Sequence, residues 1–220
     1  MNPSDVTLMI KPVGALCNLE CTYCYYLPTQ AMYDHRERRM GLDTLESVFA
    51  GYLPTAADHV TIAWQGGEPT LAGLDFFRLA VAFQKEHARP GQAVANSLQT
   101  NGTLLTDDWC RFLNEHEFLV GISIDGGAFF HDHYRLDRKG NGTHKDVLRG
   151  LELLRAHGVE HNILTVLNEH NVRYPKRVFR ELIQMKERWL QFIPAIEWVE
   201  DEHGEPTLAP FSPGGEAYGK

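Results

Sequence analysis

The sequence predicts an α/β fold built around a parallel sheet. Two observations carry this prediction: short apolar runs of strand length alternate with helical patterns, and turn-forming residues close most of them. Strands that alternate with helices pair in parallel through right-handed crossovers. We count six such units, which match a partial (β/α)6 barrel, although the count alone also allows a doubly wound sheet or a piece of an eight-fold barrel.

Each element follows from a local pattern. Apolar residues recur at helical spacing after Asp43 or Thr44, and Val60–Trp64 is an apolar run that ends at a Gly-Gly pair. Gly158 suits the left-handed position that closes a helix. By this reasoning we expect strands over residues 8–10, 60–64, 94–99, 119–124, 159–167 and 189–196, and helices over residues 42–53, 76–83, 107–118, 147–157 and 175–188.

Length and composition place these elements in one globular domain. The chain has 220 residues, of which 43% are hydrophobic and 23% charged, enough for one sizeable core. We expect the domain over residues 1–199, and residues 200–220, rich in Pro, Gly and acid, as a linker or the start of a missing extension. The net charge of −8 argues against non-specific nucleic-acid binding. No apolar run reaches membrane-spanning length and residues 1–5 lack the form of a signal peptide, which predicts a cytoplasmic protein.

The most informative stretch is a cysteine loop at residues 17–24. Cys17, Cys21 and Cys24 have the spacing C-x3-C-x2-C and follow the first apolar run. Three thiolates on one short loop can hold three corners of a [4Fe–4S] cluster. The fourth iron then has no protein ligand and is open to a chelating cofactor.

Other interpretations of the loop explain less of it. Structural zinc needs four ligands, and His35 could only be a distant fourth. A thioredoxin-type redox pair would use Cys21 and Cys24 and leave Cys17 without a role. Three buried, inert thiols are the simplest alternative, and we expect that state for the separate Cys110.

The cysteine spacing, with an aromatic residue at Tyr23 just before the last cysteine, resembles the radical S-adenosylmethionine (radical SAM) superfamily. The resemblance implies a partial (β/α)6 TIM-like barrel and two cofactors, a [4Fe–4S] cluster and S-adenosylmethionine (SAM). In that superfamily the open iron chelates the methionine part of SAM, and one electron from the cluster releases a 5′-deoxyadenosyl radical.

Distinctive residues also follow the expected strands, where parallel α/β folds bind ligands. Gly66-Gly67-Glu68-Pro69 comes after the second strand, and two glycines let a backbone approach a ligand closely. By resemblance, Gly67 and Glu68 receive the amino group of SAM. Ser123 and Arg135 match residues for its carboxylate and ribose side. Ile196 matches a contact to its adenine, and Tyr23 would contact the adenine or shield the site.

Several of these residues have simpler alternatives. Arg135 could form a surface ion pair with Asp132 or Asp137, and Ile196 could be a core residue. Asn101 could bond the cofactor or only form its turn. The histidines show no convincing metal spacing, since His131 and His133 would point to opposite sides of a strand and His157 and His161 flank a turn.

Wider matches resemble anaerobic sulfatase-maturating enzymes within the superfamily. They are Gln65 before the GGEP motif, residues 69–74 after it and Leu190–Pro194, and they extend over about the first 200 residues. The resemblance implies oxidation of a cysteine or serine in a sulfatase polypeptide to Cα-formylglycine, with electrons from a low-potential ferredoxin or flavodoxin. It also assigns substrate-peptide contacts to Tyr26 and Gln65, and a glutamine can bond a peptide amide through both its donor and its acceptor.

The family also has a cysteine-rich C-terminal extension, called SPASM, with two more clusters and an aspartate proposed as the base. Only Cys110 follows the cysteine loop in this sequence, so we expect a radical SAM core that performs full maturation poorly or not at all. Two alternative functions remain: another peptide-modifying radical SAM enzyme that forms thioether or carbon–carbon crosslinks, and a non-catalytic binding module with a zinc site.

Overall fold

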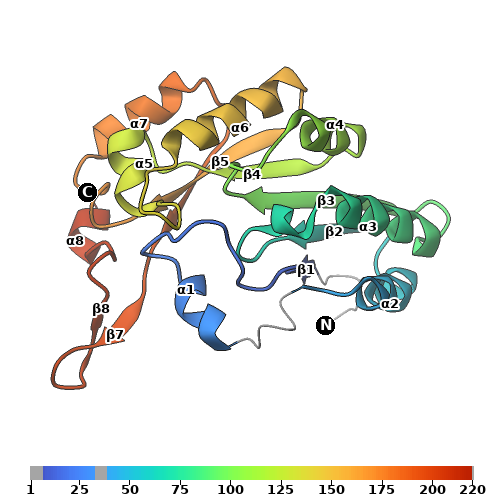
Figure 1. Ribbon diagram of the computed structural model, residues 1–220, viewed down its shortest axis with the longest axis horizontal. Coiled ribbons are helices and arrows are strands. Elements are labelled where there is room, and N and C mark those ends of the chain that lie inside the picture. Colours follow the sequence, from blue (N-terminus) through green and yellow to red (C-terminus); the bar gives the residue numbers. More distant parts are fainter. Residues whose placement is uncertain (1–6, 33–38, 220) are drawn as a thin grey trace.

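The computed structural model describes residues 7–32 and 39–219 and contains a six-stranded parallel sheet with the strand order β1-β2-β3-β4-β5-β6 (Figure 1). This order confirms the α/β prediction and is that of a partial barrel. A doubly wound sheet would instead reverse its strand order at a switch point. The strands are β1 (Leu8–Ile10), β2 (His59–Trp64), β3 (Ala93–Thr100), β4 (Leu119–Ser123), β5 (His161–Leu167) and β6 (Leu190–Pro194).

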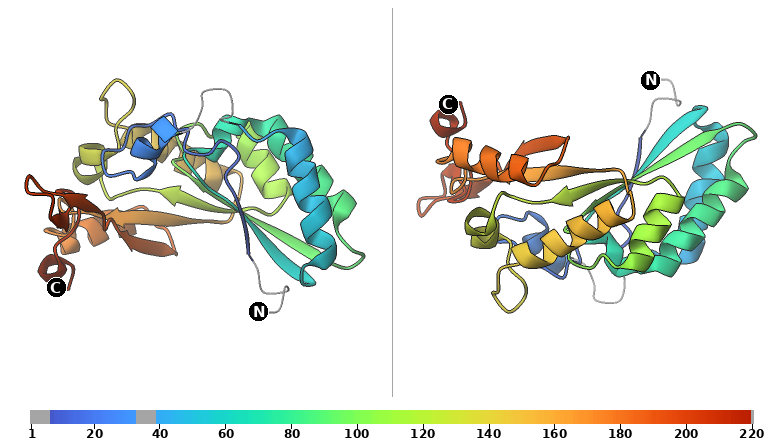
Figure 2. Two further views of the ribbon diagram at one scale, coloured as in Figure 1. Left: turned by 90° about the horizontal axis from the view of Figure 1, so that it is seen from below. Right: turned by 90° about the horizontal axis from the view of Figure 1, so that it is seen from above.

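The long helices cover the outer side of the curved sheet, and the cysteine loop lies inside its curve (Figures 1 and 2). These long helices are α2 (Leu42–Tyr52), α3 (Leu74–His87), α4 (Asp107–Glu115), α6 (His144–Ala156) and α7 (Pro175–Gln184). The core lies between helices and sheet, where the Phe77 ring centroid is 5.0 Å from that of Trp64 and 5.2 Å from that of Trp109. None of the helices in the described ranges has the length and apolar character needed to cross a membrane.

Two predicted helices end earlier than expected. Helix α4 stops at Glu115 and is followed by Glu117 with φ = 51°, and α7 stops at Gln184 and is followed by Lys186 with φ = 60°. Glycine usually marks such a left-handed residue, so sequence rules for helix ends missed both. At Gly158, where φ is +66°, the same rule is confirmed.

A short helix, α5 (Ala128–Tyr134), was not predicted and corrects the expectation for two histidines. His131 and His133 lie on this helix rather than on a strand. His131 is buried, with its ring next to the amide of Asp125 and the hydroxyl of Thr143, and therefore helps to hold the loop after β4.

The end of the chain differs from the linker that its composition suggested. Two antiparallel strands, β7 (Trp198–Glu200) and β8 (Pro206–Leu208), form a hairpin, and a short helix, α8 (Gly215–Tyr218), follows. The hairpin closes through a turn in which Gly204 has φ = +79°. Buried residues after β8, Ala209 and Ser212, attach this segment to the domain.

Candidate functional site

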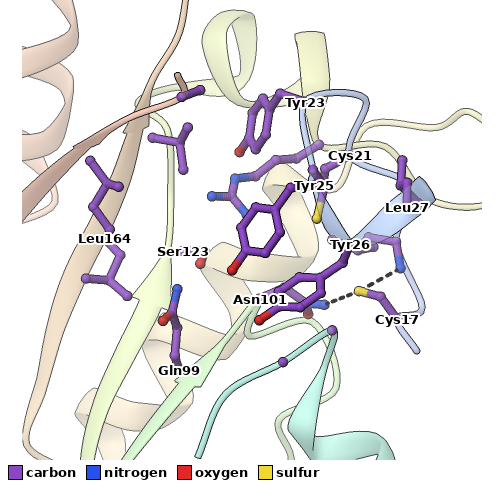
Figure 3. Close-up of a pocket in the computed structure, with 18 of the residues that line it drawn as sticks. Cys17, Cys21, Tyr23, Tyr25, Tyr26, Leu27, Gln99, Asn101, Ser123 and Leu164 are labelled. Atoms are coloured by element: carbon purple, nitrogen blue, oxygen red, sulfur yellow. Dashed lines mark hydrogen bonds between the residues drawn. The ribbon is translucent and has the colours of Figure 1, made fainter. Parts of the chain in front are cut away.

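A cavity of about 330 Å³ lies beyond the carboxyl ends of the strands, within the size range of small-molecule sites (Figure 3). Figure 3 shows Cys17 and Cys21 on one side of it and Leu164 on the other. Its walls include nearly all predicted site residues: Cys17, Cys21, Tyr23, Cys24, Tyr26, Gln65, Gly67, Ser123, Arg135 and Ile196.

The backbone holds the cysteine loop from two sides. The amide N–H of Cys24 donates to the carbonyl of Cys21 (2.8 Å), which closes a tight turn. The amides of Glu20 and Thr22 donate to the carbonyls of Leu136 (2.8 Å), just after α5, and of Tyr134 (3.1 Å), the last residue of α5. All three thiols in the loop are free and open into the same cavity.

The donor set suits a multi-iron cluster better than a single zinc ion. Burial raises the pKa of Cys17 to about 11 and that of Cys21 to about 12, so the thiolate forms need a cation nearby. Three sulfurs on one tetrahedral zinc would lie about 3.8 Å apart. The three loop sulfurs are spaced more widely, because they do not all lie within 4.8 Å of one another. Within the described ranges, the only three possible metal ligands grouped that closely are Glu46, Glu86 and His87. His35, considered as a zinc ligand, lies outside the described residues.

The two glycines after β2 allow the cysteine loop to approach. A Cβ atom on Gly66, where φ is +118°, would lie 2.6 Å from the carbonyl oxygen of Gly14, and one on Gly67 would lie 2.1 Å from that of Leu16. The amides of Gly67 and Glu68 donate to these two carbonyls, each at 2.8 Å. The close backbone contact that we expected for a ligand is therefore made, at least in part, by the chain itself.

Glu68 is not among the residues that line the cavity. It is fully buried and accepts hydrogen bonds from both the amide and the hydroxyl of Thr70, from the Thr100 hydroxyl (2.8 Å) and from the Asn101 amide (2.7 Å). Burial raises the pKa of this carboxyl group. The side chain joins the end of β3 to the turn after β2, while Gly67 lines the cavity.

A buried carboxylate, Asp125, orients two residues that were predicted to contact the cofactor. It accepts two hydrogen bonds from Arg135 (2.8 and 3.2 Å), one from the Tyr23 hydroxyl (2.5 Å) and one from the Val166 amide (2.9 Å). Burial is the largest influence on Arg135 and opposes its charge, but Asp125, Tyr23 and Cys21 together outweigh burial, and the net pKa of Arg135 is raised. Burial also raises the pKa of Tyr23. Asp132 and Asp137, considered as partners of Arg135 from sequence, do not pair with it.

The remaining polar residues differ in how they are held. The side chains of Gln65 and Ser123 line the cavity without a hydrogen-bond partner among the described residues. Asn101 both forms its turn, by accepting from the Thr103 amide (3.0 Å), and donates to the Cys17 sulfur (3.7 Å). The lining also includes Tyr25, Gln99 and Phe211, which sequence reasoning did not assign to the site.

The sequence matches the Radical SAM superfamily over residues 12–182. It is 39% identical over 211 residues to the serine-type anaerobic sulfatase-maturating enzyme of Bacteroides thetaiotaomicron, a match that covers 95% of this chain and 51% of the relative. Identity to the cysteine-type enzyme of Clostridium perfringens is also 39%, over 204 residues, 91% of this chain and 54% of the relative.

A solved structure gives the same result. Native anSMEcpe with bound AdoMet and Cp18Cys peptide superimposes with a TM-score of 0.86 at 38% identity, covering 96% of this chain and 56% of that one. This chain thus spans about half the length of the relatives that it matches. The family match, the sheet and the cysteine loop together show that the chain belongs to the radical SAM superfamily, and it is similar to anaerobic sulfatase-maturating enzymes over about half of their length.

Proposed function

We propose that Cys17, Cys21 and Cys24 hold a [4Fe–4S] cluster and that SAM binds in the adjoining cavity. The observation that carries this proposal is that three free thiols from one loop open into one cavity together with the residues matched to SAM contacts. When bound, the two cofactors supply a 5′-deoxyadenosyl radical by one-electron cleavage of SAM.

The residues of the chain would orient the cofactor and exclude water. Arg135, held by Asp125, presents a fixed guanidinium to a carboxylate, and Ser123 adds an unpartnered hydroxyl. The backbone at Gly67 would take the amino group, supported by the buried Glu68. Tyr23 and Ile196 would border the adenine.

The substrate that we propose is a sulfatase polypeptide. A cysteine or serine would lose a hydrogen atom from Cβ and then a second electron and a proton, which would give a thioaldehyde or an aldehyde. The aldehyde is Cα-formylglycine, and the thioaldehyde would reach it by hydrolysis with release of hydrogen sulfide. Relatives named for both target types match at 38–39% identity, which supports the class of reaction and not the choice between targets. The peptide would contact Gln65 and Tyr26 at the cavity wall. A low-potential ferredoxin or flavodoxin in the cytoplasm would supply the electrons. Residues 1–199 would be the core domain, and residues 200–220, which include most of the C-terminal hairpin, would be a linker or the start of an extension.

Anaerobic reconstitution tests the proposal in two steps. The chain should take up about four irons, and its cluster EPR spectrum should change when SAM is added. With dithionite it should then release 5′-deoxyadenosine, whereas a variant with all three loop cysteines changed to alanine should do neither. Formation of formylglycine from a target cysteine would lower the mass of a sulfatase-motif peptide by about 18 Da, whereas a crosslink would remove only about 2 Da. From this 220-residue chain alone we expect little or no product of 18 Da lower mass. Zinc uptake without iron, or no response to SAM, would refute the assignment.

A further inference from the structure

The cavity has two chemically different ends. One end contains the thiols of the cysteine loop with the side-chain amide of Asn101, and Leu164 lies across the cavity from Cys17 (Figure 3). The end near Leu164 is formed by β5, β6 and the last part of the chain. Its lining is mostly apolar and includes Val166, Ile193, Ile196 and Phe211, with Glu197 as one acidic residue among them.

Phe211 reaches this end because the chain turns back after the β7–β8 hairpin. The amide of Glu169 donates to the carbonyl of Phe211 (2.8 Å), and the amide of Ala209 donates to the carbonyl of Glu197 (2.9 Å). The hydroxyl of Ser212 accepts from the Glu197 amide at 3.0 Å, and Ser212 is only 5% exposed. The segment 209–212 is therefore held by Glu169, which follows β5, and by Glu197, which follows β6. Its composition alone had suggested a linker or the start of an extension.

The ring of Phe211 meets a second ring that is also fixed. Its centroid lies 6.5 Å from that of Tyr23, at an interplanar angle of 61°, and the Tyr23 hydroxyl is bonded to Asp125. The two rings form an aromatic corner where the apolar end of the cavity meets the cysteine loop. Such a corner suits a planar heterocycle, because a purine stacks on one aromatic face and packs against the edge of another.

We propose that Phe211 is a positioning residue for the adenine of SAM and that residues 209–212 form one wall of the cofactor cavity. This inference rests on the proposed function. If the methionine part of SAM lies at the cysteine end, its nucleoside base extends toward the apolar end. A side chain of the substrate peptide is the other apolar group that could fill this space, and binding measured without peptide separates the two.

The test compares Phe211→Ala with Trp198→Ala in the full chain. Trp198 is a matched aromatic on β7 that is 63% exposed and does not line the cavity. Both variants are reconstituted anaerobically and checked for iron content and thermal unfolding. Dissociation constants for SAM and for 5′-deoxyadenosine, which has no group that chelates iron, are then measured by equilibrium dialysis.

Phe211→Ala should raise the dissociation constants of both ligands by about tenfold, the usual effect of removing one stacking ring. Trp198→Ala should leave both dissociation constants unchanged. Unchanged binding in Phe211→Ala, or a loss seen only for peptide, would overturn the inference. If Phe211→Ala does not fold, Phe211→Leu keeps an apolar side chain without an aromatic face and should still weaken both ligands. A wild-type chain that binds no iron or SAM would instead refute the proposed function.

Discussion

Removing the Asp125 carboxylate should destabilise the whole domain. Asp125 is fully buried and the side chain of Arg135 is 8% exposed, so Asp125→Ala leaves a buried guanidinium without its counter-charge. Loss of one partner of a buried ion pair costs about 3–5 kcal/mol, and the Tyr23 hydroxyl loses its acceptor as well. We therefore expect the free energy of unfolding to fall by about 4 kcal/mol, or the Tm by roughly 8–16 °C for a domain of this size.

Urea denaturation followed by circular dichroism, on the metal-free chain under reducing conditions, measures this loss. Asp75→Ala is the matched control, because Asp75 pairs with Arg78 on the surface and the change should cost less than about 1 kcal/mol. The double variant Asp125→Ala/Arg135→Leu should recover part of the loss, since no charge is then left buried. A loss below about 1 kcal/mol for Asp125→Ala would refute the reasoning.

Three further predictions concern the cysteine loop. In the metal-free chain, burial raises the pKa of Cys21 in the folded state from 9.0 to about 12. Because the thiol in the unfolded state loses its proton at lower pH, the free energy of unfolding should fall as the pH rises from 9 toward 12. Urea titrations at several pH values should show a smaller fall for Cys21→Ala. Gly67→Ala places a Cβ 2.1 Å from a backbone oxygen and should cost about 1–3 kcal/mol and reduce iron uptake, whereas Gly215→Ala, with no atom within 4 Å, should do neither. Asn101→Ala removes a hydrogen-bond donor to the Cys17 sulfur and should lower the reduction potential of the cluster, measured by an EPR titration. The control Asn141→Ala, at an exposed site, should leave the potential unchanged. An equal or higher potential in Asn101→Ala would contradict the proposed role of this hydrogen bond.

Local patterns were sufficient to predict most of the fold. Strands such as β2 and β3 and helices such as α2 carry their apolar periodicity in contiguous residues, and their order along the chain sets parallel pairing. The cysteine loop was equally visible, because its three thiols lie within eight residues. These features depend on neighbours in sequence, which a single sequence displays.

What the sequence could not show depends on distant partners. Asp125 and Arg135 are ten residues apart, yet only the turn after β4 and the helix α5 between them determine that they pair. Glu68 belongs to a motif but bonds to Thr100 and Asn101 at the end of another strand. Phe211 lies in a segment whose Pro, Gly and acid content gave no apolar pattern, so its place at the cavity depends on hydrogen bonds to Glu169 and Glu197, which follow other strands.

The bonds between the cysteine loop and the backbone after α5 bear on the timing of cluster insertion. Leu136, which accepts from the Glu20 amide, lies 116 residues further along the chain. At about 10 residues per second, a ribosome needs on the order of ten seconds to reach it after finishing the loop. During that interval the three cysteines have been synthesised, but the backbone at the end of α5 that holds their loop has not. We therefore expect iron delivery to succeed only after the first four strands have been synthesised and assembled, so that maturation of this site follows translation of its middle third.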